Sequence, residues 1–422
     1  MTSLTTAYKR FALATLTLVY TLSFLDQVLI ALVLQPIKED MHLSDTELGF
    51  LTGIAFGLFY AFFGVPIARW ADRGNRAVIA SAAIALWGVT VMSCLFVRTF
   101  FQLVIARIAA AIGAAGCMPP TYSLLGDYFP DAVGRTRAMT VYMLSNPLSN
   151  LISFILGGWL NERYGWKVTF CILGIPALLV ALVVRKTIVE PRQTAGLAQI
   201  APLKQPPMLE VLLTLWRQRS ARHLSIALIL IYTMGLGMGP WYAAFMMRSH
   251  GMGTAELGLW LGSIFGVIGV AGILLGGYAS ERWFSGNERG QMRLNAVAIA
   301  ATVPCFALFL FASQKSVALA AMVPLAIAFN FFLGPVIALM QRLVIDETRA
   351  TTLAVVMLLA NLIGMGIGPQ TVGVLSDLFM PWLGSDSLRY AMLIMSCMAM
   401  WGAFHLWQAG RTVTQDLAVL AA

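Results

Sequence analysis

The sequence predicts an all-α integral membrane protein in which twelve transmembrane helices form two pseudo-symmetric halves of six helices each. Three observations lead to this prediction: an apolar composition, a series of long apolar runs and a weak internal repeat. Of the 422 residues, 59% are hydrophobic and 11% are charged, and the mean hydropathy is +0.80. This composition lies outside the usual range of soluble domains, so we expect the chain to be embedded in a bilayer.

Twelve apolar runs are long enough to cross a membrane, because a helix needs about 20 such residues to span the hydrocarbon core. A helix also satisfies its own backbone hydrogen bonds, which lipid cannot do. The first run is longer than the apolar core of a signal peptide and lacks a small-residue cleavage site, so we expect it to be retained. The expected spans cover residues 11–35, 46–68, 78–97, 100–124, 138–160, 167–184, 224–246, 256–279, 294–312, 317–340, 351–376 and 389–409.

The longest polar stretch divides these spans into two sets of six. Residues 185–222 are rich in Lys and Arg and contain several prolines, which is typical of a cytoplasmic linker. We therefore expect an N-terminal half over residues 1–184 and a C-terminal half over residues 223–422. The linker would join the two halves on one side of the membrane.

A weak repeat relates the two expected halves. The segment GRTRAMTVYMLSNP at residues 134–147 is echoed by DETRATTLAVVMLLANL at residues 346–362, with Arg137 and Arg349 in the same place. Such repeats are typical of secondary transporters, in which one half rocks against the other around a site near the membrane midplane. The repeat therefore indicates a transporter.

The distribution of positive charge predicts the topology. Counting Lys and Arg over alternate loops gives 20 on the side that holds the N-terminus, 7 on the other side and 1 within a span. Because cytoplasmic loops carry such an excess, we expect a multi-pass protein of the cell inner (plasma) membrane with both termini cytoplasmic. The net charge of +9 favours contact with anionic lipid headgroups. No basic patch interleaved with aromatic residues is present, so nucleic acid is not an expected partner.

Only two charged residues, Asp26 and Arg107, lie deep inside the expected spans. Asp26 follows Arg10 by 16 residues, or about 24 Å of helix, and Arg107 follows Thr99 by 8 residues, or about 12 Å. In a core about 30 Å thick their depths differ by about 6 Å, which an arginine side chain can bridge. A substrate anion could then compete with Asp26 for Arg107. The alternative is a permanent ion pair that only fixes helix register.

Other polar and aromatic side chains within the spans are candidates for the same substrate site. For each of them, hydrogen bonding between helices is the alternative role. Asn146 and Asn361 stand at similar points of the two repeats, which suits a site on the pseudo-symmetry axis. Together with Asp26 and Arg107, the predicted substrate and coupling set comprises Gln27, Tyr122, Asn146, Tyr232, Trp241, Asn330 and Asn361.

Three motifs follow one another in the first half: GVPIARWADRGNR at residues 64–76, ARIAAAIGAAG at 106–116 and GDYFPDAVGRTRA at 126–138. They resemble signatures of the major facilitator superfamily, which implies the major facilitator fold, although the first copy is one residue short. The four-residue spacing of Gly64 and Ala68 lets helices approach closely. The charged residues form either a cytoplasmic clamp that opens when the halves rearrange or an ordinary basic loop. The predicted conformational gate comprises Gly64, Asp72, Arg73, Arg76, Asp127, Arg135 and Arg137.

A longer stretch, from QPIKEDMHLSDTELGFLTG to AAGCMPPTYSLLGDYFP, resembles the Spinster branch of this superfamily, as does IYTMGLGMGPWYAAFMMR in span seven. The resemblance implies export of lysolipids or sphingoid phosphates, often with proton coupling. Two positions depart from the Spinster pattern, because Gln27 stands where arginine is usual and Ala114 where glutamate is usual. These departures leave the substrate and the proton coupling open.

Secondary transport of an amphipathic organic anion or lysolipid by alternating access is therefore the first hypothesis. The alternatives are a non-transporting receptor or regulator on a transporter fold and an integral membrane enzyme that acts on lipids. The four histidines lie in distant segments without HExxH spacing, which disfavours the enzyme. The five cysteines lie in apolar spans without CxxC spacing. We expect no metal, no cofactor and a monomeric protein.

Overall fold

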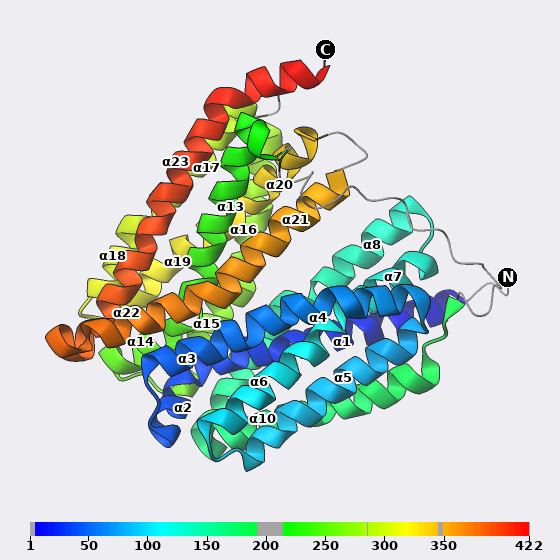
Figure 1. Cartoon of the computed structure of the whole chain (residues 1–422), viewed down its shortest axis with the longest axis vertical. Coiled ribbons are helices and arrows are strands. Elements are labelled where there is room, and N and C mark those ends of the chain that lie inside the picture. Colours follow the sequence, from blue (N-terminus) through cyan, green and yellow to red (C-terminus); the bar gives the residue numbers. More distant parts are fainter. Residues whose placement is uncertain (1–4, 192–212, 214, 285, 345–348, 422) are drawn as a thin grey trace. The chain divides into compact units, whose positions relative to one another are not determined.

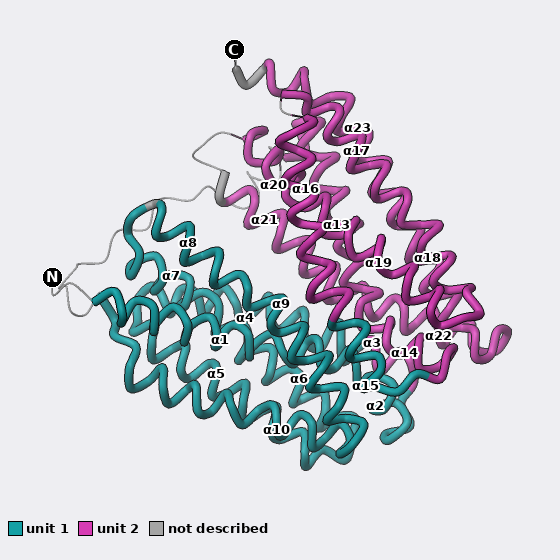
Figure 2. The backbone as a smooth tube through the Cα atoms, turned by 180° about the vertical axis from the view of Figure 1, so that it is seen from behind, with its two compact units in different colours: residues 1–43, 50–201, 252–262 teal, residues 44–49, 202–251, 263–422 magenta. Residues whose placement is uncertain are grey.

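A computed structural model of the chain describes residues 5–191, 213, 215–284, 286–344 and 349–421. Within these ranges the chain folds into helices joined by short turns and contains no strand, as predicted (Figure 1). The chain divides into two compact units (Figure 2). Unit 1 comprises residues 1–43, 50–201 and 252–262, and unit 2 comprises residues 44–49, 202–251 and 263–422.

Unit 1 is built from the helices of the first half of the chain and one short helix from the second half. Its elements are α1 (Thr6–Leu32), α2 (Leu34–Met41), α4 (Ile54–Arg73), α5 (Arg76–Ser93), η1 (Cys94–Phe96), α6 (Phe100–Ala115), α7 (Met118–Tyr128), α8 (Ala132–Met143), α9 (Ser145–Leu151), η2 (Ile152–Leu156), α10 (Gly157–Thr187) and α15 (Thr254–Leu261).

Unit 2 contains the remaining helices, and α3 (Asp45–Thr52) begins in it. Its other elements are α13 (Arg219–Met238), α14 (Trp241–His250), η3 (Gly262–Ile268), α16 (Gly269–Phe284), α17 (Glu288–Ala300), α18 (Thr302–Phe311), α19 (Lys315–Phe331), α20 (Leu333–Arg342), α21 (Arg349–Asn361), η4 (Leu362–Ile367), α22 (Gly368–Leu383), η5 (Gly384–Asp386) and α23 (Ser387–Ala421).

Among the described residues, ten helical stretches are long and apolar enough to cross a membrane. Two of them, Val133–Thr187 with 55 residues and Thr351–Ala418 with 68 residues, each cover two of the twelve expected spans. The chain turns within each stretch at a glycine with positive φ, Gly165 at 77° and Gly384 at 52°. Glycine adopts this backbone conformation without the steric penalty of other residues. The ten stretches therefore correspond to the twelve predicted spans.

Small residues allow the helices of unit 1 to pack closely. A Cβ on Gly113 of α6 would lie 2.8 Å from the backbone nitrogen of Trp87 in α5. On the other side of α5, a Cβ on Gly88 would lie 2.9 Å from the Cβ of Ala177 in α10. Such contacts are typical of membrane helices, which associate through close van der Waals packing rather than through a hydrophobic driving force.

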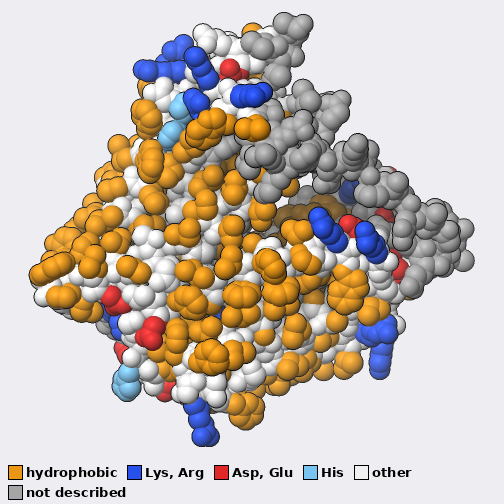
Figure 3. Space-filling model, viewed as in Figure 1, with side chains coloured by type: hydrophobic (Ala, Val, Ile, Leu, Met, Phe, Trp, Pro, Cys, Tyr) orange, Lys and Arg blue, Asp and Glu red, His pale blue; other side chains and the backbone are white. Residues whose placement is uncertain are grey.

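The outer surface of the helices is strongly apolar. Large side chains such as Phe62, Phe101 and Trp382 are exposed, and hydrophobic side chains cover much of the described surface in the view of Figure 3. A soluble protein rarely exposes so many large apolar groups. The surface is therefore suited to lipid contact.

Both ends of the stretch predicted as a linker are structured. Helix α10 continues to Thr187, and α13 begins at Arg219. The centre of the stretch, residues 192–212 and 214, lies outside the described residues. The division of the chain at residues 185–222 stays a prediction.

Candidate functional site

Asp26 and Arg107 meet inside unit 1. Asp26 lies on α1 and Arg107 on α6, and Nη1 of Arg107 is 2.5 Å from Oδ2 of Asp26. Only 2% of Asp26 and 3% of Arg107 are exposed. The sequence-based prediction that these two side chains reach one another is confirmed. A buried pair avoids the penalty of a bare charge, but removing one partner typically costs about 3–5 kcal/mol.

The rest of the Arg107 guanidinium is also held by α4 and the chain before it. Its Nε donates to the carbonyl of Leu51 at 3.4 Å. Its Cζ lies 4.8 Å from the centre of the Phe56 ring, within the range of a cation–π interaction. The Phe56 ring in turn stacks on Tyr60, with a centroid distance of 5.8 Å. The charge is therefore fixed by an acid, a carbonyl and an aromatic face together.

A cluster of aromatic side chains lies in the same unit, nearer to the N-terminus of α1 than Asp26. Tyr142 of α8 stacks on Tyr20 of α1 at 4.9 Å and meets Tyr122 of α7 edge-on at 5.2 Å. The Tyr142 hydroxyl lies 2.5 Å from the hydroxyl of Thr121. Tyr122 is half-buried, and its hydroxyl lies 3.7 Å from the sulfur of Met143. Of these rings, only Tyr122 belongs to the predicted substrate set.

The other predicted substrate residues of unit 1 lie apart from this pair. Gln27 follows Asp26 on α1, is half-buried and has no hydrogen bond to the described residues through its side chain. Asn146 is exposed, and its Oδ1 accepts a hydrogen bond from Nδ2 of Asn150 at 3.1 Å. This bond lies within one turn of the chain, so it is not the hydrogen bond between helices that was the alternative to ligand contact.

Unit 2 contains Tyr232, Trp241, Asn330 and Asn361. Trp241 is fully buried, and its Nε1 donates to the carbonyl of Pro369 at 3.2 Å. Asn330 and Asn361 are half-buried, and each donates to the carbonyl four residues earlier in its own helix, at 2.9 Å and 2.8 Å. Tyr232 is half-buried on α13. Trp241 and both asparagines therefore already have hydrogen-bond partners in the described structure, and their part in substrate binding stays a prediction.

A charge cluster of unit 1 is centred on Arg76. This side chain is fully buried and donates to the carboxylate of Glu190 through Nε, at 3.1 Å from both oxygens, and through Nη2. Nη2 also lies 2.6 Å from Oδ2 of Asp127, and Nη1 donates to the hydroxyl of Ser123 at 2.8 Å. Arg76 and Asp127 of the predicted gate thus meet at a fully buried guanidinium.

The other charged residues of the predicted gate lie outside this cluster, and their role in gating stays a prediction. Arg135 donates to the carbonyls of Phe129 and Gly126, both at 3.3 Å, so it caps the end of α7. Asp72, Arg73 and Arg137 are exposed, and none of them is joined to Arg76 by a contact between described residues.

A Cβ added to Gly64 would meet no described atom within 4 Å. The close helix contact predicted at Gly64 therefore stays a prediction.

Comparison with known proteins now identifies the family. The model of the Major Facilitator Superfamily matches residues 16–369. The chain belongs to the Major Facilitator Superfamily. The prediction of this fold, drawn from three motifs in the first half, is confirmed.

Two relatives and one solved structure place this superfamily member near the Spinster branch. It is 29% identical to an MFS-type efflux pump of Mycolicibacterium smegmatis over 412 residues, which cover 96% of this chain and 94% of the relative. It is 25% identical to protein spinster homolog 1 of Xenopus tropicalis over 88% of this chain and 75% of the relative. The crystal structure of a bacterial homolog of the human lysosomal transporter Spinster, in an inward-facing and unoccupied conformation, superimposes with a TM-score of 0.85 at 28% identity. That match covers 98% of this chain and 99% of the other chain.

The family defines the broad class of the protein. Members of the Major Facilitator Superfamily are membrane transporters, so this multi-pass protein is of the transporter class and is not an enzyme.

The sequence did not indicate three residues that belong to these sites in the superfamily member, one in the Arg76 cluster and two in the aromatic cluster. Glu190 falls in the predicted linker, where an acid followed by Pro191 gave no reason to expect burial. Its position just after an apolar span was the available signal. Tyr20 and Tyr142 lay in apolar runs, where aromatic residues are most often packing groups. Only the stacking of Tyr20 on Tyr142 and the contact of Tyr142 with Tyr122 distinguish them.

Proposed function

We propose that the protein is a secondary transporter that moves an amphipathic organic anion or a lysolipid across the membrane by alternating access. The observation that supports this proposal most directly is the buried pair of Asp26 and Arg107, at 2.5 Å within unit 1. Charged residues inside a membrane protein mark substrate or ion pathways by default. The relatives named as an efflux pump and as a Spinster homologue support the same class.

The chemistry of the pair suits an exchange of anions on Arg107. In the empty protein, the carboxylate of Asp26 neutralises the guanidinium. An incoming carboxylate or phosphate takes the place of Asp26, and arginine binds both through its planar fork. Arg107 then always has one anionic partner, so the guanidinium is never left buried and unpaired. Asp26, once released, is stabilised by water that enters with the substrate.

The aromatic side chains provide an apolar counterpart to this charge. Phe56 lies against Arg107 itself, and Tyr20, Tyr122 and Tyr142 form the cluster further along the unit. Such rings present large apolar faces with a few hydroxyl groups. An anionic headgroup on Arg107 with a hydrocarbon tail directed towards these rings fits an amphipathic substrate better than a small sugar.

The cluster around Arg76 is our candidate for the cytoplasmic gate. Arg76 is the first residue of α5, and Asp127 lies in the last turn of α7. Both charges oppose the helix dipoles, which favour an acid at the N-terminus and a base at the C-terminus. Glu190 compensates for this arrangement. Because Glu190 is needed to stabilise Arg76 beside Asp127, the cluster is suited to open when Glu190 moves away, as gating requires.

The remaining features of the proposal follow from charge and from the family. We place the protein in the cell inner (plasma) membrane with both termini cytoplasmic, on the excess of Lys and Arg in alternate loops. Proton coupling is proposed to be weak, because Ala114 offers no titratable group where glutamate is usual in the Spinster pattern. The protein is proposed to act as a monomer and to need no cofactor or metal.

Flux into proteoliposomes tests the proposal. A fluorescent lysophospholipid with an anionic headgroup is the probe, and the variants are Asp26→Asn and Arg107→Ala. Both are expected to reduce flux by at least about tenfold, because each removes half of a buried pair. Arg98→Ala, at an exposed arginine before α6, is the matched control and should transport normally.

The same experiment separates the alternatives. Binding of the probe without movement would refute transport in favour of a receptor. Chemical conversion of the probe would refute both. Undiminished flux in either variant would remove that residue from the mechanism.

A further inference from the structure

Two short helices, α3 and α15, carry the same sequence pattern. Residues 45–53 read DTELGFLTG and residues 254–262 read TAELGLWLG. Each helix has eight residues and is followed by a break from α-helical geometry that begins at Gly53 or Gly262. They start spans two and eight, which are equivalent in a protein made of two six-helix repeats.

The contacts of these helices define two clasps. In the α3 clasp, residues 44–49 pack on α22 within unit 2. In the α15 clasp, residues 252–262 pack on η2 and α10 within unit 1. The sequences that receive them are also related, since residues 157–162 read GGWLNE and residues 372–377 read VGVLSD. The shared pattern therefore extends to both partners of each clasp.

Glycines bring the backbones into direct contact in both clasps. In the α3 clasp, a Cβ on Gly373 would lie 2.2 Å from the carbonyl oxygen of Asp45. In the α15 clasp, a Cβ on Gly158 would lie 2.4 Å from the carbonyl oxygen of Thr254. No side chain fits at either distance, so the two contacts are equivalent in geometry.

Each clasp also has an acid that caps the docked helix. Asp377 accepts hydrogen bonds from the backbone nitrogens of Asp45 and Thr46, at 3.1 Å and 2.7 Å. Glu162 accepts one from the backbone nitrogen of Ala255, at 2.7 Å. Carboxylates are favourable at helix N-termini, because they satisfy free N–H groups and complement the helix dipole.

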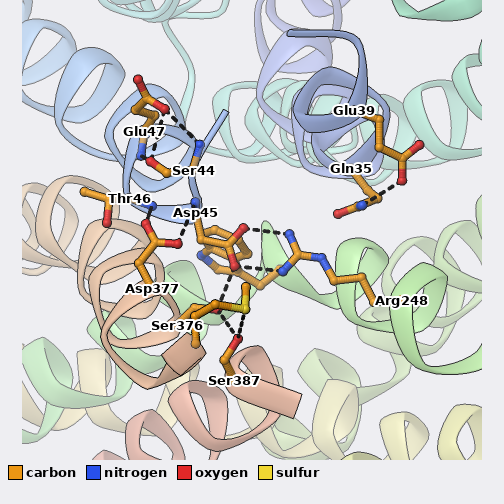
Figure 4. A network of polar contacts seen from close by, with 12 residues as sticks. Gln35, Glu39, Ser44, Asp45, Thr46, Glu47, Arg248, Ser376, Asp377 and Ser387 are labelled. Carbon is orange, nitrogen blue, oxygen red and sulfur yellow. Dashed lines mark hydrogen bonds and ion pairs between the residues drawn. The ribbon is translucent and has the colours of Figure 1, made fainter. Parts of the chain in front are cut away.

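The clasps differ in one respect, which is buried charge. Asp45 is fully buried, and both of its oxygens are bound by Arg248 at 2.7 Å, while Ser376 donates to Oδ2 at 2.6 Å (Figure 4). The equivalent position in the α15 clasp is Thr254, a neutral residue. Its hydroxyl donates to the carbonyl of Gly158 at 3.0 Å and accepts from Asn161 at 3.1 Å.

The course of the chain makes this difference mechanically relevant. Residues 44–49 are continuous with unit 1 at both ends but pack in unit 2. Residues 252–262 are continuous with unit 2 at both ends but pack in unit 1. A rearrangement of the units, as alternating access requires, therefore pulls on both clasps.

We infer that Asp45 and Arg248 form a charged latch that keeps residues 44–49 docked in unit 2, whereas the neutral α15 clasp releases residues 252–262 from unit 1 without a comparable barrier. This inference rests on the proposed alternating access. Opening the latch exposes a carboxylate and a guanidinium that must both be hydrated. The latch therefore has two distinct states, one with the two charges paired and buried and one with both charges in water. The α15 clasp exchanges only neutral hydrogen bonds, which water replaces readily.

Cysteine labelling tests the latch without using any substrate. Leu48 and Leu257 occupy equivalent places beside Gly49 and Gly258, and both are fully buried. Leu48→Cys and Leu257→Cys serve as matched reporters in two proteins from which the five native cysteines have been removed. The labelling rate of each reporter is measured in proteoliposomes with a membrane-impermeant maleimide.

The expected results differ between the reporters. Asp45→Asn or Arg248→Met should raise labelling of Leu48→Cys by at least about tenfold, because each leaves one buried charge that is stabilised only by opening. The double variant should label more slowly than either single variant, because it has no charge to hydrate. Thr254→Val should change labelling of Leu257→Cys by less than about threefold, since only neutral bonds are lost.

Two results would overturn the latch. One is unchanged labelling of Leu48→Cys in both single variants. The other is an equal rise at Leu48→Cys and Leu257→Cys, which would indicate general loosening of the fold. Flux in the unsubstituted protein is a separate readout. Absent flux with the expected labelling pattern would refute the proposed function and keep the latch, and normal flux with unchanged labelling would refute the latch alone.

Discussion

Arg76 and Glu288 occupy the same position in their units but carry opposite charges. Each is the first residue of its helix, α5 or α17, and each follows an asparagine that caps the helix. Arg76 lies 2.6 Å from Asp127, and Glu288 lies 2.7 Å from Arg342, both partners being in the last turn of another helix. The Glu288 pair follows the helix dipoles and the Arg76 pair opposes them. This explains why Arg76 has a further anionic partner.

Replacing that further partner should weaken unit 1 strongly. Glu190→Gln leaves the buried Arg76 with one carboxylate instead of two. We expect a loss of about 3 kcal/mol of stability, which is typical for breaking a buried pair. Glu288→Gln is the matched control, and it should cost less than about 1 kcal/mol, because the Arg342 side chain is 58% exposed. Thermal unfolding of both variants in the same detergent would measure the difference, and equal shifts would contradict the argument.

The fold could be predicted because an apolar composition and apolar runs of about 20 residues identify membrane helices. The Asp26–Arg107 pair was predictable for a similar reason, since two charges in apolar runs must find a partner. The similar depths of Asp26 and Arg107 along their helices then indicated that the two side chains could reach one another. The clasps were not predicted, although the shared ELG pattern was visible, because Asp45 and Arg248 lie at span ends where charges are common. Burial alone distinguishes them, and burial depends on tertiary packing.

The same reasoning applies to Gly64. The spacing of small residues identified a helix face, but it could not show which helix, if any, packs on that face. By contrast, Gly158 contacts backbone directly, although no spacing rule singled it out. Sequence patterns locate small residues, whereas only coordinates reveal the contact.

Alanine substitution at these two glycines should therefore have opposite effects. Gly158→Ala places a methyl group 2.4 Å from the carbonyl oxygen of Thr254, so we expect a loss of about 1–3 kcal/mol. Gly64→Ala meets no described atom and should stabilise α4 by about 0.5–1 kcal/mol, because alanine loses less entropy in a helix. Melting temperatures of the two variants test this. A large loss with Gly64→Ala would show that the residue has a close neighbour in the working protein.

His250 should make stability depend on pH. Burial, and next the positive charge of Arg389, lower the pKa of His250 from its usual value of 6.5. Its Nε2 is buried and has no hydrogen-bond partner among the described residues. The unfolded chain therefore binds the proton more readily than the folded chain, and stability should fall as pH drops below about 6.5. His250→Gln should reduce the dependence of the melting temperature on pH between pH 7 and pH 5. An unchanged pH dependence would exclude His250 as its cause.

The pH dependence of transport decides whether Asp26 carries protons. Ala114 stands where a titratable glutamate is usual in the Spinster pattern, and Asp26 is bound to a permanent cation at 2.5 Å. Because Ala114 offers no titratable side chain at that place, flux should vary by less than about threefold between pH 6 and pH 8. The measurement is proteoliposome flux of the anionic lysophospholipid, with and without a proton gradient.

Arg107→Lys is the informative variant, because it keeps the charge but loses the fork that binds carboxylate and phosphate. It should reduce flux without creating a pH dependence. A steep proton-driven flux that disappears in Asp26→Asn would instead make the aspartate the proton carrier and replace anion exchange as the mechanism.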